Sequence, residues 1–109
     1  MGFFSKDTEV DALNQIEKIN RDMREISATI HLNYNMIDGR NRRKLQLLYS
    51  SVVSKVRKYE RIKNNLSDFE QGMLLGAPIT VWNGEQTGVL MWESYLRDTL
   101  QQLAKDINY

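Results

Sequence analysis

The sequence predicts an all-α protein, a three-helix bundle in which a long antiparallel helical hairpin is closed by a C-terminal helix. Two observations lead to this fold class. Apolar residues recur at helical spacing along long segments. The chain has only one Pro and six Gly, which leaves little material for the turns of a multi-stranded β protein. With 109 residues, of which 41% are hydrophobic, it is expected to form a single domain with its own core.

The first helix is predicted over residues 8–37. Its apolar residues recur every seven positions, at Ile16, Met23, Ile30 and Ile37. Thr8 followed by Asp11 resembles a capping box, which would begin the helix. Asp38-Gly39 is predicted to end it, because Gly enters the left-handed conformation at low cost.

The second helix is predicted over residues 40–71. One heptad position is apolar throughout, at Leu45, Val52, Tyr59, Leu66 and Met73. The next position holds Leu48, Ile62 and Phe69, with Lys55 as the one polar exception. Two periodic segments joined by so short a turn are expected to lie antiparallel.

The third helix is predicted over residues 84–107, because Asn83 and Gln86 have capping-box spacing. Its apolar stripe consists of Val89, Trp92, Leu96, Leu100, Leu103 and Ile107. This helix is the shortest of the three and leaves part of the hairpin uncovered. The sequence therefore predicts a homo-oligomer, with coiled-coil contacts through the uncovered part.

The connection, residues 72–83, contains more apolar surface than a linker needs. Two conformations are compatible with it: a short extended segment at 79–82, or a β-hairpin of that segment with 88–92, turning at Asn83-Gly84. The candidate residues for binding a protein partner are Leu75, Ile79, Val81, Trp82 and Trp92. Aromatic side chains on an adaptable segment suit partner docking. The alternative is that the segment folds back and closes the end of the bundle.

Charge is segregated along the chain, although the whole sequence carries only +1. Residues 39–66 contain nine basic and one acidic side chain, whereas the flanking segments are acidic. Four of the basic residues lie at the predicted hairpin tip, namely Arg40, Arg42, Arg43 and Lys44. Cations at a helix N-terminus are unfavourable, so this tip is a candidate site for nucleic acid or a nucleotide-like small anion. The alternative is that acidic groups of the same molecule or of a neighbouring subunit neutralise it.

No motif in the sequence points to catalysis. There is no Cys, and the single His31 has no carboxylate at helical spacing, so we expect no enzyme activity, no metal site and no cofactor. The apolar runs are too short to span a bilayer, and the lack of Cys fits a reducing compartment, so a cytoplasmic protein is expected. Phe3 and Phe4 are candidates for an exposed anchor or a hydrophobic staple. The predicted function is that of a non-enzymatic interaction module, such as an adaptor, inhibitor or assembly factor.

Overall fold

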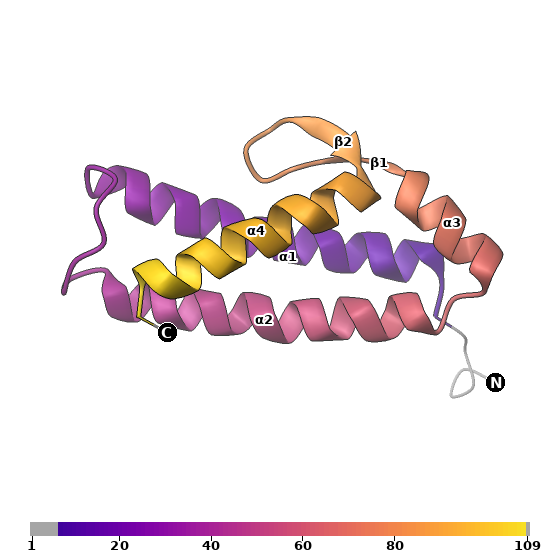
Figure 1. The fold of residues 1–109 in the computed structure, drawn as a ribbon, viewed down its shortest axis with the longest axis horizontal. Helices are drawn as coiled ribbons and strands as arrows, with labels where there is room; N and C mark the ends of the chain where they lie inside the picture. The colour runs from indigo at the N-terminus through magenta and orange to yellow at the C-terminus, as the bar shows by residue number, and fades with distance from the viewer. Residues whose placement is uncertain (1–6, 109) are drawn as a thin grey trace.

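The protein is mostly helical, as predicted. A computed structural model describes residues 7–108, so Phe3 and Phe4 lie outside the described residues (Figure 1). Within residues 7–108 the chain forms four helices and one small two-stranded sheet. In chain order the elements are α1 (Glu9–Leu32), α2 (Arg42–Asn64), α3 (Asp68–Gly76), β1 (Pro78–Thr80), β2 (Gln86–Gly88) and α4 (Val89–Asp106). No helix within residues 7–108 has the length and hydropathy needed to cross a membrane.

Helices α1 and α2 lie side by side and antiparallel (Figure 1). The capping box predicted for α1 is confirmed: Thr8 Oγ1 accepts a hydrogen bond from Asp11 N at 3.3 Å, and Thr8 N donates to Asp11 Oδ2 at 2.8 Å. The buried side chains of the two helices follow the predicted heptad positions, including Ile16, Met23, Leu45, Val52 and Tyr59.

Helix α1 is shorter than predicted, because it ends at Leu32 instead of residue 37. Tyr34 and Asn35 follow with φ of 57° and 59°, in the left-handed region that interrupts an α-helix. The connection to α2 is therefore a longer loop than the predicted Asp38-Gly39 turn. Ile37 still lies half-buried against the core, so its apolar character reflects packing in a loop.

The prediction of one helix over 40–71 is wrong, since α2 ends at Asn64 and α3 is a separate helix. A second capping box starts α3: Glu70 N donates to Ser67 Oγ at 3.2 Å, and Ser67 N donates to Glu70 Oε1 at 3.1 Å. Leu66, in the turn between α2 and α3, remains buried, but the break between these helices rotates the apolar side chains that follow it outward. Phe69 and Met73 are consequently exposed.

The predicted third helix also begins later, at Val89 instead of residue 84. The capping box expected from Gln86 does not form, because Gln86–Gly88 belong to strand β2. This strand pairs antiparallel with β1, with Ile79 opposite Thr87. The hairpin alternative is thus correct in kind, although its second strand precedes residues 88–92. Gly84 occupies the turn with φ of 91°, as a residue without Cβ readily does.

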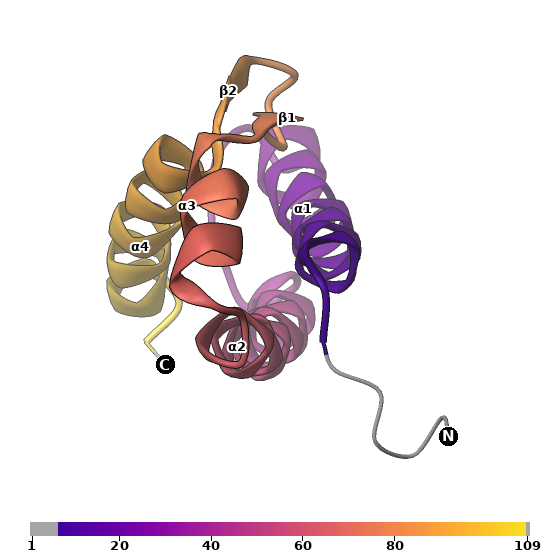
Figure 2. The same ribbon diagram turned by 90° about the vertical axis from the view of Figure 1, so that its right-hand side faces the viewer.

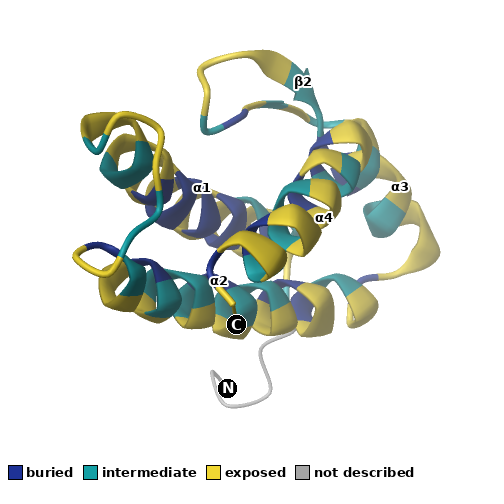
Figure 3. Ribbon diagram, turned by 60° about the vertical axis from the view of Figure 1, so that its left-hand side comes forward, coloured by how far each residue is buried: buried dark blue, intermediate teal, exposed yellow. Residues whose placement is uncertain are grey.

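Helix α4 closes the bundle with its predicted apolar stripe, of which only Leu100 is partly exposed. Viewed along the long axis, α1 and α4 lie on opposite sides above α2 (Figure 2). Helix α3 rises from the end of α2 and lies between α1 and α4, and the β-hairpin lies on the side away from α2 (Figure 2). The most buried residues line the inner faces of these elements, and α2 and α4 show half-buried positions along their length (Figure 3).

Candidate interaction groove

The connection between α3 and α4 folds back onto the bundle. Of the five residues predicted to bind a partner, Val81 and Trp92 are buried, with exposed fractions of 2% and 0%. They are inaccessible to another protein in this conformation. The other three are half-buried and pack against the core, namely Leu75, Ile79 and Trp82. The structure therefore brings the five residues together, and the connection forms a cover over the core of the bundle.

A buried asparagine holds this cover in place. Asn20, on α1, is 1% exposed and uses both ends of its amide group. Its Nδ2 donates to the backbone carbonyl of Thr80 at 2.8 Å, and its Oδ1 accepts from Trp92 Nε1 at 2.8 Å. One side chain therefore connects α1, the β-hairpin and α4. Asn20 was not among the predicted site residues, because its only signal in the sequence is that of a polar residue immediately beside the apolar stripe of α1.

Two of the four cations of the basic tip have acidic partners among the described residues. Asp38 Oδ1 accepts backbone hydrogen bonds from Arg40 at 2.8 Å and from Asn41 at 3.3 Å, in the manner of a helix cap. Arg40 also forms an ion pair with Asp38 at 3.0 Å. Hydrogen bonds from Asn33 and Arg40 hold the pKa of the Asp38 carboxyl well below its ordinary value. The place where an external anion was expected is occupied by this carboxylate.

The other tip residues do not converge on one site. Lys44 forms an exposed ion pair with Glu25 of α1 at 3.5 Å. Arg43 is exposed, and Arg42 is half-buried. Among the described residues, the buried Nε of Arg42 has no hydrogen-bond partner.

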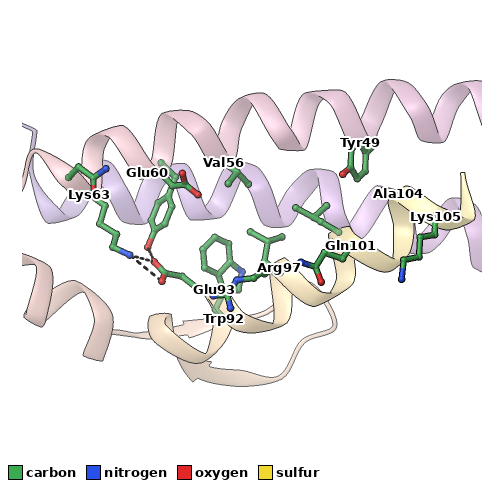
Figure 4. Close-up of a pocket in the computed structure, with 14 residues that line it drawn as sticks. Tyr49, Val56, Glu60, Lys63, Trp92, Glu93, Arg97, Gln101, Ala104 and Lys105 are labelled. Atoms are coloured by element: carbon green, nitrogen blue, oxygen red, sulfur yellow. Dashed lines mark hydrogen bonds and ion pairs between the residues drawn. The ribbon is translucent and has the colours of Figure 1, made fainter. Parts of the chain in front are cut away.

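A groove of about 910 Å³ lies between α2 and α4 (Figure 4). Its floor is apolar and aromatic, formed by Tyr49, Val56, Tyr59, Trp92, Leu96, Leu100 and Ala104. Its rim is polar and charged, formed by Glu60, Lys63, Asn64, Glu93, Arg97, Gln101 and Lys105. An apolar surface bordered by polar groups is typical of binding sites. All of its lining residues belong to α2 or α4, and none to α1.

One end of the groove is fixed by a polar cluster that joins its two walls. Tyr59 Oη donates to Glu93 Oε2 at 2.6 Å, and Lys63 Nζ donates to the same oxygen at 2.9 Å. Burial and the Glu93 carboxylate raise the pKa of Tyr59, so the phenol stays protonated and remains a donor. The Tyr59 ring also meets Trp92 edge-on, with centroids 5.5 Å apart. These groups satisfy one another and hold α2 and α4 at a fixed separation.

A second, smaller cleft of about 310 Å³ lies between α1 and α2. Elsewhere along this pair of helices opposite charges meet, as where Lys55 Nζ contacts Asp22 Oδ2 at 2.7 Å. This contact explains the polar exception in the heptad of α2. At the small cleft, however, Lys18, Lys58 and Arg61 come together, and none of their side chains makes a hydrogen bond or ion pair within residues 7–108. Asp7 and Asp11 also line it and accept hydrogen bonds from the neutral Asn65 and Thr8, so two acids face these three bases.

At the polar end of the groove, Lys63 and Glu93 form an ion pair at 2.9 Å. His31 is exposed on α1, away from the groove. Within the part of the chain that the structure describes, no three His, Asp or Glu side chains are grouped as metal ligands would be. Comparison of the chain with known protein families, with curated proteins and with solved structures finds no match.

Proposed function

We propose that this protein is a non-enzymatic interaction module that receives a helix in the groove between α2 and α4. The observation that carries the proposal is the open groove of about 910 Å³, with an apolar floor inside a charged rim. Binding of an amphipathic helix in a groove between helices is a common mode of recognition. An adaptor, inhibitor or assembly factor would act in this way.

The walls of the groove support this function because they are held before any partner arrives. Lys63, Tyr59 and Glu93 connect α2 to α4 at one end. At the other end, Gln46 Nε2 donates to the carbonyl of Ile107 at 3.2 Å. A site that is already ordered loses less conformational entropy on binding than a flexible one.

The test is to block the floor of the groove. Ala104→Arg places a long charged side chain over the floor, and Ala28→Arg makes the same change on the exposed face of α1. Wild type and both variants, checked for folding by circular dichroism, are used to capture proteins from an extract of the source organism. We expect at least one protein to bind wild type and Ala28→Arg but not Ala104→Arg. Equal capture by all three would contradict the proposal. Gln101→Trp, at the exposed rim, provides a second variant if Ala104→Arg unfolds.

We propose anion binding, including nucleic acid, as a second candidate function, with its centre on α2 instead of the tip. The unpaired cations Lys18, Lys58 and Arg61 favour it, because the tip cations Arg40 and Lys44 already have acidic partners. Binding of labelled single-stranded DNA is expected to weaken steeply with salt. Lys58→Glu/Arg61→Glu is expected to abolish it, whereas Arg24→Glu on α1 changes it less. Lack of binding at low salt would exclude this candidate.

A further inference from the structure

We infer that the tip of the α1–α2 hairpin binds the surface of a membrane that contains anionic lipids. The tip comprises residues 32–44, which are the last residue of α1, the loop that follows it and the first turn of α2. It protrudes beyond the C-terminal end of α4, at one end of the long axis of the molecule (Figure 1). None of its residues lines the groove, so the inference is independent of the proposed function.

The first observation is a group of large apolar side chains that the tip presents to solvent. Leu32, Tyr34 and Met36 lie within a run of five residues and have exposed fractions of 81%, 88% and 58%. Single exposed apolar residues are common on protein surfaces, but a group of them on one protruding segment indicates a contact surface. The tip is exposed over most of its loop (Figure 3).

The loop is ordered by its own hydrogen bonds, although its exposed apolar side chains are not part of the core. Asn33 Nδ2 and Asn41 Nδ2 both donate to the backbone carbonyl of Met36, at 3.2 and 3.0 Å. Between these anchors, Tyr34 and Asn35 have positive φ, which residues other than glycine seldom adopt. Because the loop already has this shape, presenting its apolar side chains to a partner costs little conformational entropy.

The second observation is an excess of positive charge at the tip. Two of its four cations have acidic partners, but Arg42 and Arg43 form no ion pair with any other described residue. The end of α4, which is hydrogen-bonded to α2 nearby, adds one base and one acid, Lys105 and Asp106. An excess of two positive charges therefore remains among the described residues at this end of the molecule.

These two observations together fit a lipid surface better than a small anion or a nucleic acid. A small anion needs donors that converge on one point, whereas an anionic membrane is a diffuse layer to which spread cations all contribute. A nucleic acid would also attract the cations, but it offers no apolar layer to Leu32 and Met36. The boundary between headgroups and acyl chains does, and Tyr is enriched at that depth. We expect the apolar side chains to enter this boundary while the cations stay among the headgroups.

Vesicle sedimentation tests the inference with the full-length protein. Wild type is expected to bind vesicles of phosphatidylcholine with about one-third phosphatidylserine, and to bind phosphatidylcholine alone at least about tenfold more weakly. Leu32→Ser/Met36→Ser should raise the dissociation constant for the mixed vesicles by about tenfold or more, because the apolar contact is lost. Arg43→Glu should raise it by about tenfold, and high salt should weaken binding of the wild type.

Matched controls make the same kinds of change away from the tip. Phe69→Ser/Met73→Ser removes two exposed apolar side chains from α3, at the opposite end of the molecule (Figure 1). Arg57→Glu reverses an exposed charge further along α2. Both controls are expected to bind the mixed vesicles within about twofold of wild type.

Fluorescence of introduced Trp residues measures the depth of insertion. Lipids brominated on their acyl chains should quench Tyr34→Trp more strongly than wild type, since this residue enters the boundary. Tyr95→Trp, on α4, should be quenched no more than wild type.

Several results would overturn the inference. Wild type might show no binding to the mixed vesicles at low salt, or equal binding to both kinds of vesicle. Leu32→Ser/Met36→Ser might bind as well as wild type, or the controls might lose binding to the same extent. If labelled single-stranded DNA binds in a way that Arg43→Glu weakens, and vesicles do not bind, the tip is a nucleic-acid site and the membrane is excluded. None of these results bears on capture of a protein by the groove, which Ala104→Arg tests separately.

Discussion

Replacing Asn20 with Leu tests whether the buried hydrogen bonds of this residue fix the cover of the bundle. Leu has a similar size but neither a donor nor an acceptor. The Trp92 indole is 0% exposed, so its N–H would have no water to replace Asn20 Oδ1. An unsatisfied buried donor costs about 1–3 kcal/mol. Thr80 is exposed, so its carbonyl regains water, and this second lost bond is expected to cost only about 0.5–1 kcal/mol.

The expected loss is therefore about 2–4 kcal/mol in the free energy of unfolding, a large part of the 5–15 kcal/mol typical of a domain. Urea unfolding followed by far-ultraviolet circular dichroism measures it. Asn14→Leu, at an exposed position of the same helix, is the control and should stay within about 0.5 kcal/mol of wild type.

Trp92→Phe completes a double-mutant cycle. It removes the N–H donor, and its cost should be lower in the Asn20→Leu background by about 1 kcal/mol or more. A loss below about 0.5 kcal/mol for Asn20→Leu, or additive effects of the two changes, would refute the structural role assigned to this hydrogen bond.

Three further predictions concern the caps and the titrating groups. Ser67→Ala removes the capping box of α3, so it is expected to lower the free energy of unfolding by about 1 kcal/mol and to speed amide exchange in that helix. Ser54→Ala, at an exposed position of α2, should do neither. The pKa of Asp38 is lower in the folded than in the unfolded protein. The ionised carboxylate therefore stabilises the fold above the ordinary pKa of 3.8, and this stabilisation is lost as the pH falls below that value. The difference in Tm between wild type and Asp38→Asn should shrink when the pH is lowered from 6 to about 2.5. The pKa of Tyr59 is higher in the folded than in the unfolded protein, so the phenol of the unfolded chain ionises at a lower pH. The free energy of unfolding is therefore expected to fall as the pH rises above about 10. Ultraviolet titration should show one phenol that ionises only on unfolding, and this phenol should be missing in Tyr59→Phe.

Periodicity predicted the helical class and nearly all of the core, but it extended the second helix too far. The heptad pattern of α2 continues through Leu66 to Met73, so a helix read from apolar spacing alone continues as well. The local capping box of Ser67 and Glu70 starts a new helix instead, and the exposed Met73 no longer follows the pattern. At Ser67 the local cap, and not the apolar repeat, marks where the helix begins.

The candidate site was harder to predict than the core. Trp92 belongs to the apolar stripe of α4 and was also a candidate for binding a partner; the structure shows it buried in the core. The groove depends on how far α4 lies from α2, which is a property of tertiary packing that spacing along the chain does not contain. Periodicity also gave no sign that Asp38, just before the basic segment, would bind Arg40 and so answer one of the four tip cations.

The hydrogen bonds of Asn20 also constrain the order in which the chain can fold. The helices α1 and α2 are neighbours in sequence, so they are able to pair early, at little cost in loop closure. The partners of Asn20 lie 60 and 72 residues away, at Thr80 and Trp92. During synthesis, a chain that ends before these residues has a paired α1 and α2 whose interior contains an unsatisfied amide. We expect such an intermediate to remain loosely packed until the C-terminal quarter of the chain arrives, and the burial of Trp92 to mark the last step of folding.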